Sequence, residues 1–319
     1  MYEDTTYILT NYHVVYDYYA NSDNGGKIAR KIYGYLYGSE DEPTKTNATE
    51  NGYDVYDYGD YAIELEYVGG SIAHDIAVLK VDTQKILAIN QNAQAVKLAD
   101  NYYVGETAIA IGNPENEGIS ATQGIVSVDN EYISLQMDEL VRKYRSIRID
   151  TSIYGGSSGG GLFNKQGELI GLTNAGDQNN QNINYAIPIQ IVKAVTNNIL
   201  YYKDSTQSGT IKQITLGIQV ATSNSQYVYD QSTGYGDIKE TITLSEVVEN
   251  SIAKTLDLQV GDIIKSIYIN ENEYKINRSF DIADTLLNIR ETDKIKIAYN
   301  RNSQNLLTEE YTILVSDLK

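Results

Sequence analysis

One serine of this chain, Ser158, lies in a segment with the composition of a nucleophile loop. Residues 154–162 read YGGSSGGGL. Glycines around a serine let the backbone turn sharply, bring bare N–H groups close to a reacting carbonyl and leave the hydroxyl exposed. A flexible turn has the same composition, so the segment alone leaves both interpretations open. The residues that follow, 162–173, predict a strand, a tight turn and a second strand, which would hold the serine on a rigid β scaffold.

A serine nucleophile needs a general base and a carboxylate that orients this base. The chain has only two histidines. His13 follows an expected strand over residues 7–10, and Asp75 precedes the apolar run 76–81. Because desolvation of a carboxylate is costly, a carboxylate that enters a buried strand is expected to have a partner. The candidate triad is therefore His13, Asp75 and Ser158. The other histidine, next to Asp75, would point the opposite way on a strand, and we expect it at the surface.

Composition excludes several classes of function. The chain has 319 residues, which suits two domains, and at 41% hydrophobic residues it can bury a sizeable core. A formal charge of −18 predicts no nucleic-acid partner, because phosphate binding needs clustered Lys and Arg. The absence of cysteine excludes disulfides and thiolate metal sites, and fits either a reducing cytoplasm or a bacterial exterior. With two histidines and no HExxH-type spacing, we expect neither a metal site nor a cofactor. We find no membrane anchor or signal peptide in this chain.

The chain predicts a β-rich first domain and a second domain behind a linker. Short alternating runs over residues 6–173 are typical of β structure. Pro188 is expected to open a helix that ends this domain. A polar linker follows over 203–210. Beyond it we expect a helix over 280–289 with Ser279 as its N-cap, and strands over 217–220, 241–248, 263–269, 294–299 and 311–315.

Residues 17–61 form an acidic, Tyr-rich segment. Its alternation predicts extra strands or a long surface hairpin. Three interpretations stay open: a regulatory or partner-binding loop, a decorated surface loop without such a role, and a Ca²⁺ site. The segment lacks the ordered ligand spacing of a calcium loop.

Five segments in order resemble a known family. They are YILTNYHVV at 7–15, DIAVLKVD at 75–82, AIGNP at 110–114 leading to QGIVS at 123–127, GSSGGGL at 156–162, and YAIP at 185–188. Together they are similar to the HtrA (DegP- and DegQ-like) trypsin-like serine proteases that carry a PDZ domain. The chain order His, Asp, Ser agrees with this resemblance.

The resemblance implies a mainly β fold, with a chymotrypsin-like double β-barrel followed by a PDZ-like α+β domain. The protease domain would span 1–203 with an insertion at 17–61. The linker would then be 204–213, and the PDZ-like domain 214–319.

The resemblance also implies a role for each site residue. Ser158 corresponds to the nucleophile, His13 to its general base, and Asp75 to the group that fixes the imidazole. The backbone N–H groups of Gly156 and Ser158 correspond to the oxyanion hole. Ser152 corresponds to the base of the S1 pocket, and because it is uncharged we expect a small or apolar P1 side chain. The family's prolines beside the nucleophile are missing here, so we expect a more flexible loop and a low basal activity.

In the second domain, Leu216, Gly217 and Ile218 resemble the loop whose amides bind a peptide's terminal carboxylate. VGDII at 260–264 matches a turn of the family, and the helix at 280–289 would flank the peptide groove.

The function implied is that of an endopeptidase acting on unfolded or misfolded proteins, with a homo-oligomer, a trimer in this family, as its expected assembly. The rival hypothesis is a catalytically weak or inactive homologue that binds peptides through its PDZ domain. Relatives carry a further strand and a signal or membrane anchor before the segment that matches 7–10. We therefore expect this chain to be an N-terminal truncation of an extracytoplasmic protein.

Overall fold

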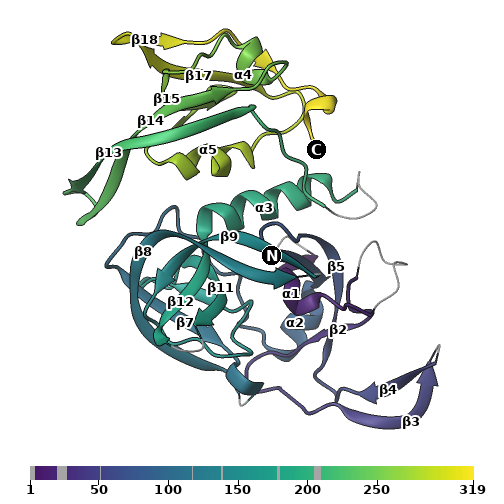
Figure 1. The fold of residues 1–319 in the computed structure, drawn as a ribbon. Coiled ribbons are helices and arrows are strands. Elements are labelled where there is room, and N and C mark those ends of the chain that lie inside the picture. The colour runs from purple at the N-terminus through teal and green to yellow at the C-terminus, as the bar shows by residue number, and fades with distance from the viewer. Residues whose placement is uncertain are drawn as a thin grey trace. The chain divides into compact units, whose positions relative to one another are not determined.

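The computed structural model describes residues 4–19, 27–50, 52–116, 118–137, 139–177, 180–204 and 210–319. The chain divides into two compact units. The first comprises residues 1–192 and 199–210, and the second comprises 193–198 and 211–319. Strands make up most of the regular structure in both units, which confirms the prediction of a mainly β chain (Figure 1).

The first unit begins with an open four-stranded sheet in the order β1-β6-β5-β2. Its apolar strand β6 lies between β1 and β5, so both of its edges are hydrogen-bonded, and the consecutive buried residues 76–79 show that both of its faces are covered. Two short helices, α1 and α2, follow β1 and β6. The bounds are Thr5–Thr10 (β1), Tyr12–Val15 (α1), Ile32–Gly34 (β2), Ile63–Ser71 (β5), Ile76–Asp82 (β6) and Thr83–Ile89 (α2).

The second part of this unit is a closed barrel in the order β10-β11-β12-β9-β8-β7. Its interior is filled by aliphatic side chains, among them Ile147, Leu162 and Ile170, all with no exposed surface. The sequence predicts two barrels. In the described residues one of them is this closed barrel, and the other is the open four-stranded sheet. The bounds are Thr107–Gly112 (β7), Ser120–Met137 (β8), Leu140–Ile149 (β9), Gly161–Phe163 (β10), Leu169–Asp177 (β11) and Asn180–Pro188 (β12).

The acidic, Tyr-rich segment forms the hairpin that its alternation predicts. Strand β3 (Thr44–Glu50) pairs with β4 (Tyr53–Asp57) as a separate two-stranded sheet with mostly exposed side chains. The hairpin extends away from the four-stranded sheet (Figure 1). Tyr33 on β2 stacks on Tyr58 just after β4, with ring centroids 3.9 Å apart, which ties the base of the hairpin to that sheet. Residues 20–26 and 51 of this segment lie outside the described residues.

A helix, α3 (Ile189–Tyr202), begins directly after Pro188, which occupies the N-cap position. The predicted helix is therefore present. It begins one residue later than predicted, because Pro188 precedes the helix and does not lie in its first turn. Its apolar residues recur at helical spacing and are buried: Ile189, Ile191, Val192, Val195 and Ile199. Of the expected linker, residues 205–209 lie outside the described residues.

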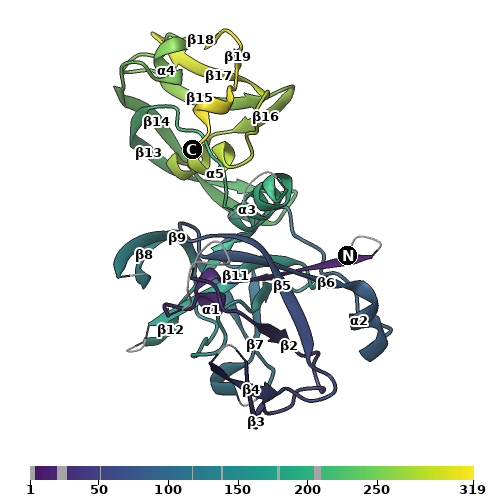
Figure 2. The same ribbon diagram turned by 90° about the vertical axis from the view of Figure 1, so that its right-hand side faces the viewer.

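The second unit is a seven-stranded sheet with helices α4 and α5 (Figure 2). Its core is a cluster of buried aliphatic residues from the sheet and both helices. The bounds are Ile218–Asp230 (β13), Tyr235–Val247 (β14), Ile252–Thr255 (α4), Ile263–Ile269 (β15), Asn272–Lys275 (β16), Ser279–Leu286 (α5), Lys294–Arg301 (β17), Gln304–Leu307 (β18) and Tyr311–Thr312 (β19).

The start of α5 differs from the sequence prediction. Ser279 was expected as the N-cap, but Arg278 occupies that position and Ser279 is the first helical residue. The carboxylate of Asp281 accepts the backbone N–H groups of Asn277 and Arg278, at 2.8 and 2.9 Å. These bonds satisfy the N–H groups just before the helix, so the cap is made by a side chain from inside the first turn.

An ion pair with a buried carboxylate and a partly exposed guanidinium lies in the second unit. Arg301 donates through Nε and Nη2 to the two carboxylate oxygens of Asp262, at 2.7 and 2.9 Å. The Asp262 side chain is 1% exposed, and it also accepts the backbone N–H of Gln259 at 2.8 Å. Asp262 belongs to the VGD turn before β15, so the pair joins that turn to the end of β17.

We expect Arg301→Ala to lower the free energy of unfolding by about 3 kcal/mol, because it leaves the Asp262 carboxylate buried without its cation. Urea unfolding of the full chain measures this change. Lys254→Ala is the control, since Lys254 pairs with Glu249 where both side chains are exposed, and it should leave the curve unchanged. Equal curves for the two variants would contradict the prediction.

Candidate active site

Asp75 ends the turn between β5 and β6 and has a fully buried side chain. Its Oδ1 accepts the backbone N–H of His13 at 2.9 Å, and its Oδ2 lies 2.7 Å from His13 Nδ1. Its backbone carbonyl accepts Asn11 Nδ2 at 3.0 Å. A buried carboxylate is tolerated when it is paired and hydrogen-bonded, and Asp75 meets both conditions. Its φ of 54° is a strained value for a residue other than glycine, so the surrounding contacts must hold it.

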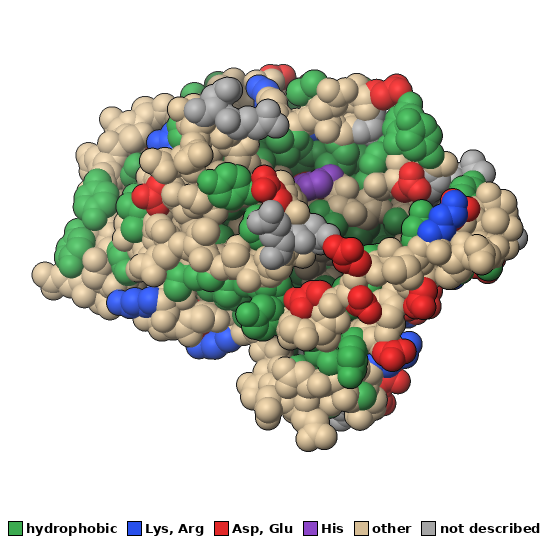
Figure 3. Space-filling view, turned by 90° about the horizontal axis from the view of Figure 1, so that it is seen from below, with side chains coloured by type: hydrophobic (Ala, Val, Ile, Leu, Met, Phe, Trp, Pro, Cys, Tyr) green, Lys and Arg blue, Asp and Glu red, His purple; other side chains and the backbone are tan. Residues whose placement is uncertain are grey.

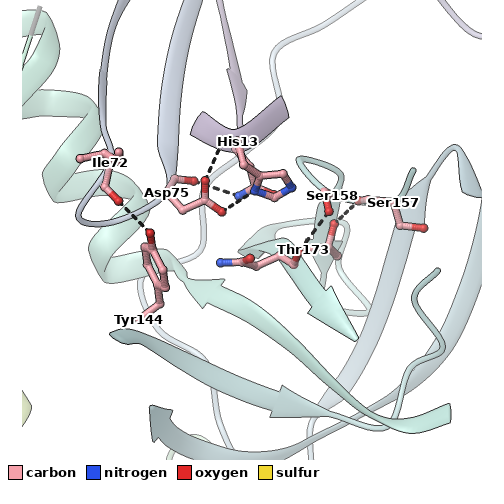
Figure 4. A network of polar contacts seen from close by, with 9 residues as sticks. His13, Ile72, Asp75, Tyr144, Ser157, Ser158 and Thr173 are labelled. Carbon is pink, nitrogen blue, oxygen red and sulfur yellow. Dashed lines mark hydrogen bonds and ion pairs between the residues drawn. The ribbon is translucent and has the colours of Figure 1, made fainter. Parts of the chain in front are cut away.

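His13 lies in α1, immediately after β1, and its side chain is 35% exposed. Its Nδ1–H points to the Asp75 carboxylate, which selects the tautomer with a bare Nε2. Figure 4 shows the imidazole between Asp75 on one side and Ser158 on the other. A partly exposed imidazole held in this way can accept a proton from a neighbouring hydroxyl.

Ser158 lies in the loop between β9 and β10, and its hydroxyl donates to the backbone carbonyl of Asn174 at 3.0 Å. A serine hydroxyl has one proton, so in this conformation it is not donated to His13. Asn174 is the extra residue of a β-bulge in β11, where the register with β12 shifts between Thr173 and Ala175. The bulge takes the Asn174 carbonyl out of the ladder and makes it available to Ser158.

Two backbone N–H groups beside Ser158 are available as donors. Among the described residues, the N–H groups of Gly156 and Ser158 donate to no protein acceptor, whereas those of Ser157 and Gly159 donate to backbone carbonyls. Gly156 has a φ of 93°, and a Cβ there would lie 2.4 Å from the backbone oxygen of Asn113. Glycine is therefore required at 156. A pair of unused N–H groups is the arrangement that stabilises an oxyanion.

The nucleophile loop is tied to β11 by several bonds. The N–H of Gly159 donates to the Thr173 carbonyl at 3.0 Å, and the Thr173 N–H donates to Gly160 at 2.9 Å. The Thr173 hydroxyl donates to the carbonyl of Ser157 (Figure 4). The glycine-rich loop thus rests on a strand, as the strand, turn and strand pattern after Ser158 predicts.

A cleft of about 430 Å³ opens beside Ser158. One wall is the nucleophile loop, including Gly156 and Gly160, and the other is mainly aliphatic but also contains Thr10, Lys31 and Tyr33. The aliphatic part of this wall comes from β1, α1, β2, β5 and β6, through Ile8, Val14, Ile32, Leu65 and Leu79. The surface view shows a histidine in a hollow among hydrophobic side chains, with acidic side chains near by (Figure 3). An extended chain with apolar side chains would fit this lining.

Ser152 precedes the nucleophile loop and is half-buried. Its backbone carbonyl accepts the Thr122 hydroxyl at 2.8 Å. Among the described residues, Ser152 is not one of those that line the cleft. Near by, the Asp150 carboxylate accepts the Ile125 N–H at 2.6 Å and so joins the end of β9 to β8.

In the second unit, the segment at 216–218 has the form of an amide loop. Gly217 has a φ of 76°, and a Cβ there would lie 2.3 Å from Cβ of Ser251. The carbonyls of Leu216 and Gly217 accept the N–H groups of Ala253 and Val248. The N–H groups of Leu216 and Gly217 themselves donate to no acceptor in the described part of the chain. Ile218 begins β13, where it pairs with β14.

Several contacts of the site carried no signal in the sequence. Asn11 lies in the motif at 7–15, but its bond to the Asp75 carbonyl was not predicted. Tyr144 and Asn174 are ordinary strand and bulge residues, and only the folded chain brings Tyr144 to Ile72 in the turn before Asp75, and Asn174 to Ser158. Within the described ranges, no group of three or more His, Cys, Asp or Glu side chains is placed to hold a metal ion. In the same ranges, no helix is long and apolar enough to cross a membrane.

The comparisons with known proteins agree with this geometry. A model described as the trypsin-like peptidase domain matches residues 1–172, which is more than half of the chain. The chain belongs to the trypsin-like peptidase family. Its relatives are HtrA-type proteases, which confirms the resemblance found in the sequence.

Three relatives illustrate the match. Serine endoprotease DegS of Haemophilus influenzae is 32% identical over 206 residues, covering 63% of this chain and 53% of the relative. Periplasmic serine endoprotease DegP of Salmonella typhimurium is 34% identical over 211 residues, covering 64% and 40%. Serine protease Do-like HtrA of Lactococcus lactis subsp. cremoris is 26% identical over 315 residues, covering 94% and 65%. The chain thus spans about half the length of the DegS and DegP relatives.

Solved structures give the same fold. HtrA-type protease AlgW with a tripeptide has a TM-score of 0.57 at 24% identity, covering 100% of this chain and 87% of that chain. The same protease with a decapeptide has a TM-score of 0.53 at 24% identity, covering 98% and 81%. These matches confirm the predicted fold class.

His74 corrects one expectation. It lies in a turn before β6 and not on a strand, it is half-buried, and its Nδ1 lies 2.8 Å from the Ser71 hydroxyl. It is therefore not a surface residue. Burial lowers the pKa of His74 from 6.5 to about 4.

The low pKa of His74 predicts a stability that depends on pH. Between pH 6.5 and about 4 the unfolded chain binds this proton and the folded chain does not, so stability falls as pH drops through that window. The slope due to His74 is at most about 1.4 kcal/mol per pH unit. Urea unfolding of the wild type and His74→Gln at pH 7 and 4.5 measures it, and the variant should lose less stability on acidification. Equal losses would contradict the prediction.

Proposed function

We propose that this protein is a serine endopeptidase whose catalytic triad is His13, Asp75 and Ser158. The observation that carries the proposal is the 2.7 Å contact between His13 Nδ1 and the buried Asp75 carboxylate. It leaves Nε2 bare and facing the side of Ser158 (Figure 4). Membership of the trypsin-like peptidase family and the HtrA-type relatives support the same activity.

Catalysis would begin with rotation of the Ser158 hydroxyl from the Asn174 carbonyl toward His13. The serine oxygen attacks the scissile carbonyl while His13 Nε2 takes its proton, and Asp75 stabilises the imidazolium that forms. His13 then gives this proton to the leaving amine, which releases the C-terminal product and leaves an acyl-enzyme. A water molecule, deprotonated by His13, hydrolyses the acyl-enzyme, and Ser158 regains its proton.

The negative charge that develops on the substrate oxygen would be received by the N–H groups of Gly156 and Ser158. Both donors are unused in the described structure, so they need not break another bond first. In a low-dielectric site, losing one such donor costs roughly 10²–10³ in rate.

The substrates we propose are unfolded or misfolded proteins. An extended segment can add along the cleft, whose wall of aliphatic side chains favours apolar residues. A small or apolar P1 side chain is proposed on the family resemblance, in which the uncharged Ser152 corresponds to the base of the S1 pocket, although Ser152 is not among the described residues that line the cleft. The relatives named DegP are periplasmic, and on that likeness we propose an extracytoplasmic location for this protein. A homo-oligomeric assembly is proposed on the family resemblance found in the sequence alone.

We further propose a protease domain over 1–203, a linker over 204–213 and a PDZ-like domain over 214–319 that binds peptide C-termini. The unused N–H groups of Leu216 and Gly217 support carboxylate binding at the segment 216–218.

A second candidate function is that of a catalytically weak homologue that binds peptides through the second domain. It is favoured by one observation, that the Ser158 hydroxyl is bonded to Asn174 and not to His13.

A fluorophosphonate probe distinguishes the two functions. We expect the wild type to be labelled at Ser158, and Ser158→Ala and His13→Ala to lose the label, because the first removes the nucleophile and the second its base. Ser157→Ala is the matched control, since Ser157 lies in the same loop, and it should retain labelling. Unlabelled wild type that still binds peptides would favour the second function.

Peptide binding by the second domain is tested with one apolar peptide bearing either a free C-terminal carboxylate or an amide. The full chain with Ser158→Ala avoids cleavage. We expect the amidated peptide to bind roughly 10- to 100-fold more weakly, because charge-assisted bonds to backbone N–H groups are lost. Fluorescence anisotropy measures the two affinities. Equal affinities would exclude the segment 216–218 as a carboxylate site.

A further inference from the structure

The turn that carries Asp75 is contacted by a residue from the other half of the first unit. Tyr144 lies on β9 of the closed barrel and is 2% exposed. Its hydroxyl donates to the backbone carbonyl of Ile72 at 3.0 Å (Figure 4). Ile72 is the first residue of the turn at 72–75, which joins β5 to β6 of the open sheet. The bond therefore joins the barrel to the turn that ends in Asp75.

The turn needs such support, because Asp75 combines a positive φ with a fully buried charge. A non-glycine residue in this conformation costs on the order of 1 kcal/mol and persists when its surroundings determine it. Asn11 holds the far end of the turn through the Asp75 carbonyl. Tyr144 holds the near end through Ile72. Between them the turn itself is closed by the His74 N–H, which donates to Ser71 at 3.2 Å.

The raised pKa of the Tyr144 phenol lets its hydroxyl donate the hydrogen bond to Ile72 at every neutral pH. Burial, and next the negative charge of Asp75, raise the pKa of the Tyr144 phenol to about 12. The hydroxyl keeps its proton throughout the neutral pH range, so the bond to Ile72 is not switched off there.

The two halves of the candidate site come from different sheets. Ser158 belongs to the barrel, whereas His13 and Asp75 belong to the open sheet. The distance and angle between the Ser158 hydroxyl and the His13 imidazole therefore depend on how the barrel and the open sheet are placed relative to each other. We propose that Tyr144 is a positioning residue that sets the Asp75 turn, and through it the His13 imidazole, relative to the barrel that carries Ser158. This inference rests on the proposed triad.

Tyr144→Phe removes the hydroxyl and keeps the buried ring. The matched control is Tyr102→Phe, because Tyr102 is also buried, at 7% exposed. Its hydroxyl donates to the Asp129 carbonyl at 2.7 Å and accepts Arg145 Nη1 at 3.4 Å, and neither partner is a triad residue. We expect Tyr144→Phe to lower kcat about tenfold with KM nearly unchanged, since a small misplacement of reacting groups acts on the chemical step. Tyr102→Phe should leave both constants unchanged even if it lowers Tm equally.

A second readout does not depend on activity. The proton on His13 Nδ1, shared with Asp75, gives a far-downfield NMR resonance, and with two histidines in the chain it is assigned by comparison with His74→Gln. We expect Tyr144→Phe to shift or broaden this resonance, and Tyr102→Phe to leave it in place. An unaltered resonance in Tyr144→Phe, or an equal change in Tyr102→Phe, would overturn the inference.

The proposed function and the proposed role of Tyr144 can be contradicted independently of each other. If the wild type neither cleaves protein nor reacts with a fluorophosphonate, the proposed function is contradicted. The resonance still decides whether Tyr144 sets the Asp75 turn.

Discussion

The burial of the Asp75 carboxylate is the constraint on which the rest of the site depends. Taking this carboxylate out of water is costly, so the buried anion needs dedicated hydrogen-bond donors. His13 supplies two of them, its backbone N–H and its ring Nδ1–H. The same bonds that make the buried charge tolerable also fix the tautomer and the direction of the imidazole. Stability and catalytic geometry therefore come from one set of contacts.

The opposite half of the site is organised around backbone groups and not around side chains. The β-bulge at Asn174 frees one carbonyl, and Gly156, at a φ that suits glycine, leaves one N–H unused. Thr173 anchors the loop between them through its backbone and its hydroxyl. These bonds to β11 restrain the loop that carries Ser158.

The sequence was sufficient where a local pattern has a single physical explanation. The apolar run before Asp82 predicted β6, whereas the glycines around Ser158 alone left a flexible turn and a nucleophile loop both open. It was insufficient where a role depends on register or on a distant partner. Asn174 matters because it is the extra residue of a bulge, and Tyr144 because β9 brings it to a turn 72 residues away in sequence. The start of α5 was displaced for a similar reason, since the cap is made by Asp281 from inside the helix.

The hydroxyl bond between Ser158 and Asn174 does not by itself imply a weak enzyme. Rotation of the Ser158 hydroxyl toward His13 exchanges one neutral hydrogen bond for another. The net contribution of such a bond to stability is only about 1 kcal/mol. A bound substrate that favours the conformer directed at His13 would shift the balance toward it. A collapsed oxyanion hole would be a greater obstacle, since each donor supplies several kcal/mol of transition-state stabilisation. The unused N–H groups of Gly156 and Ser158 are therefore the better guide to catalytic competence than the direction of the serine hydroxyl.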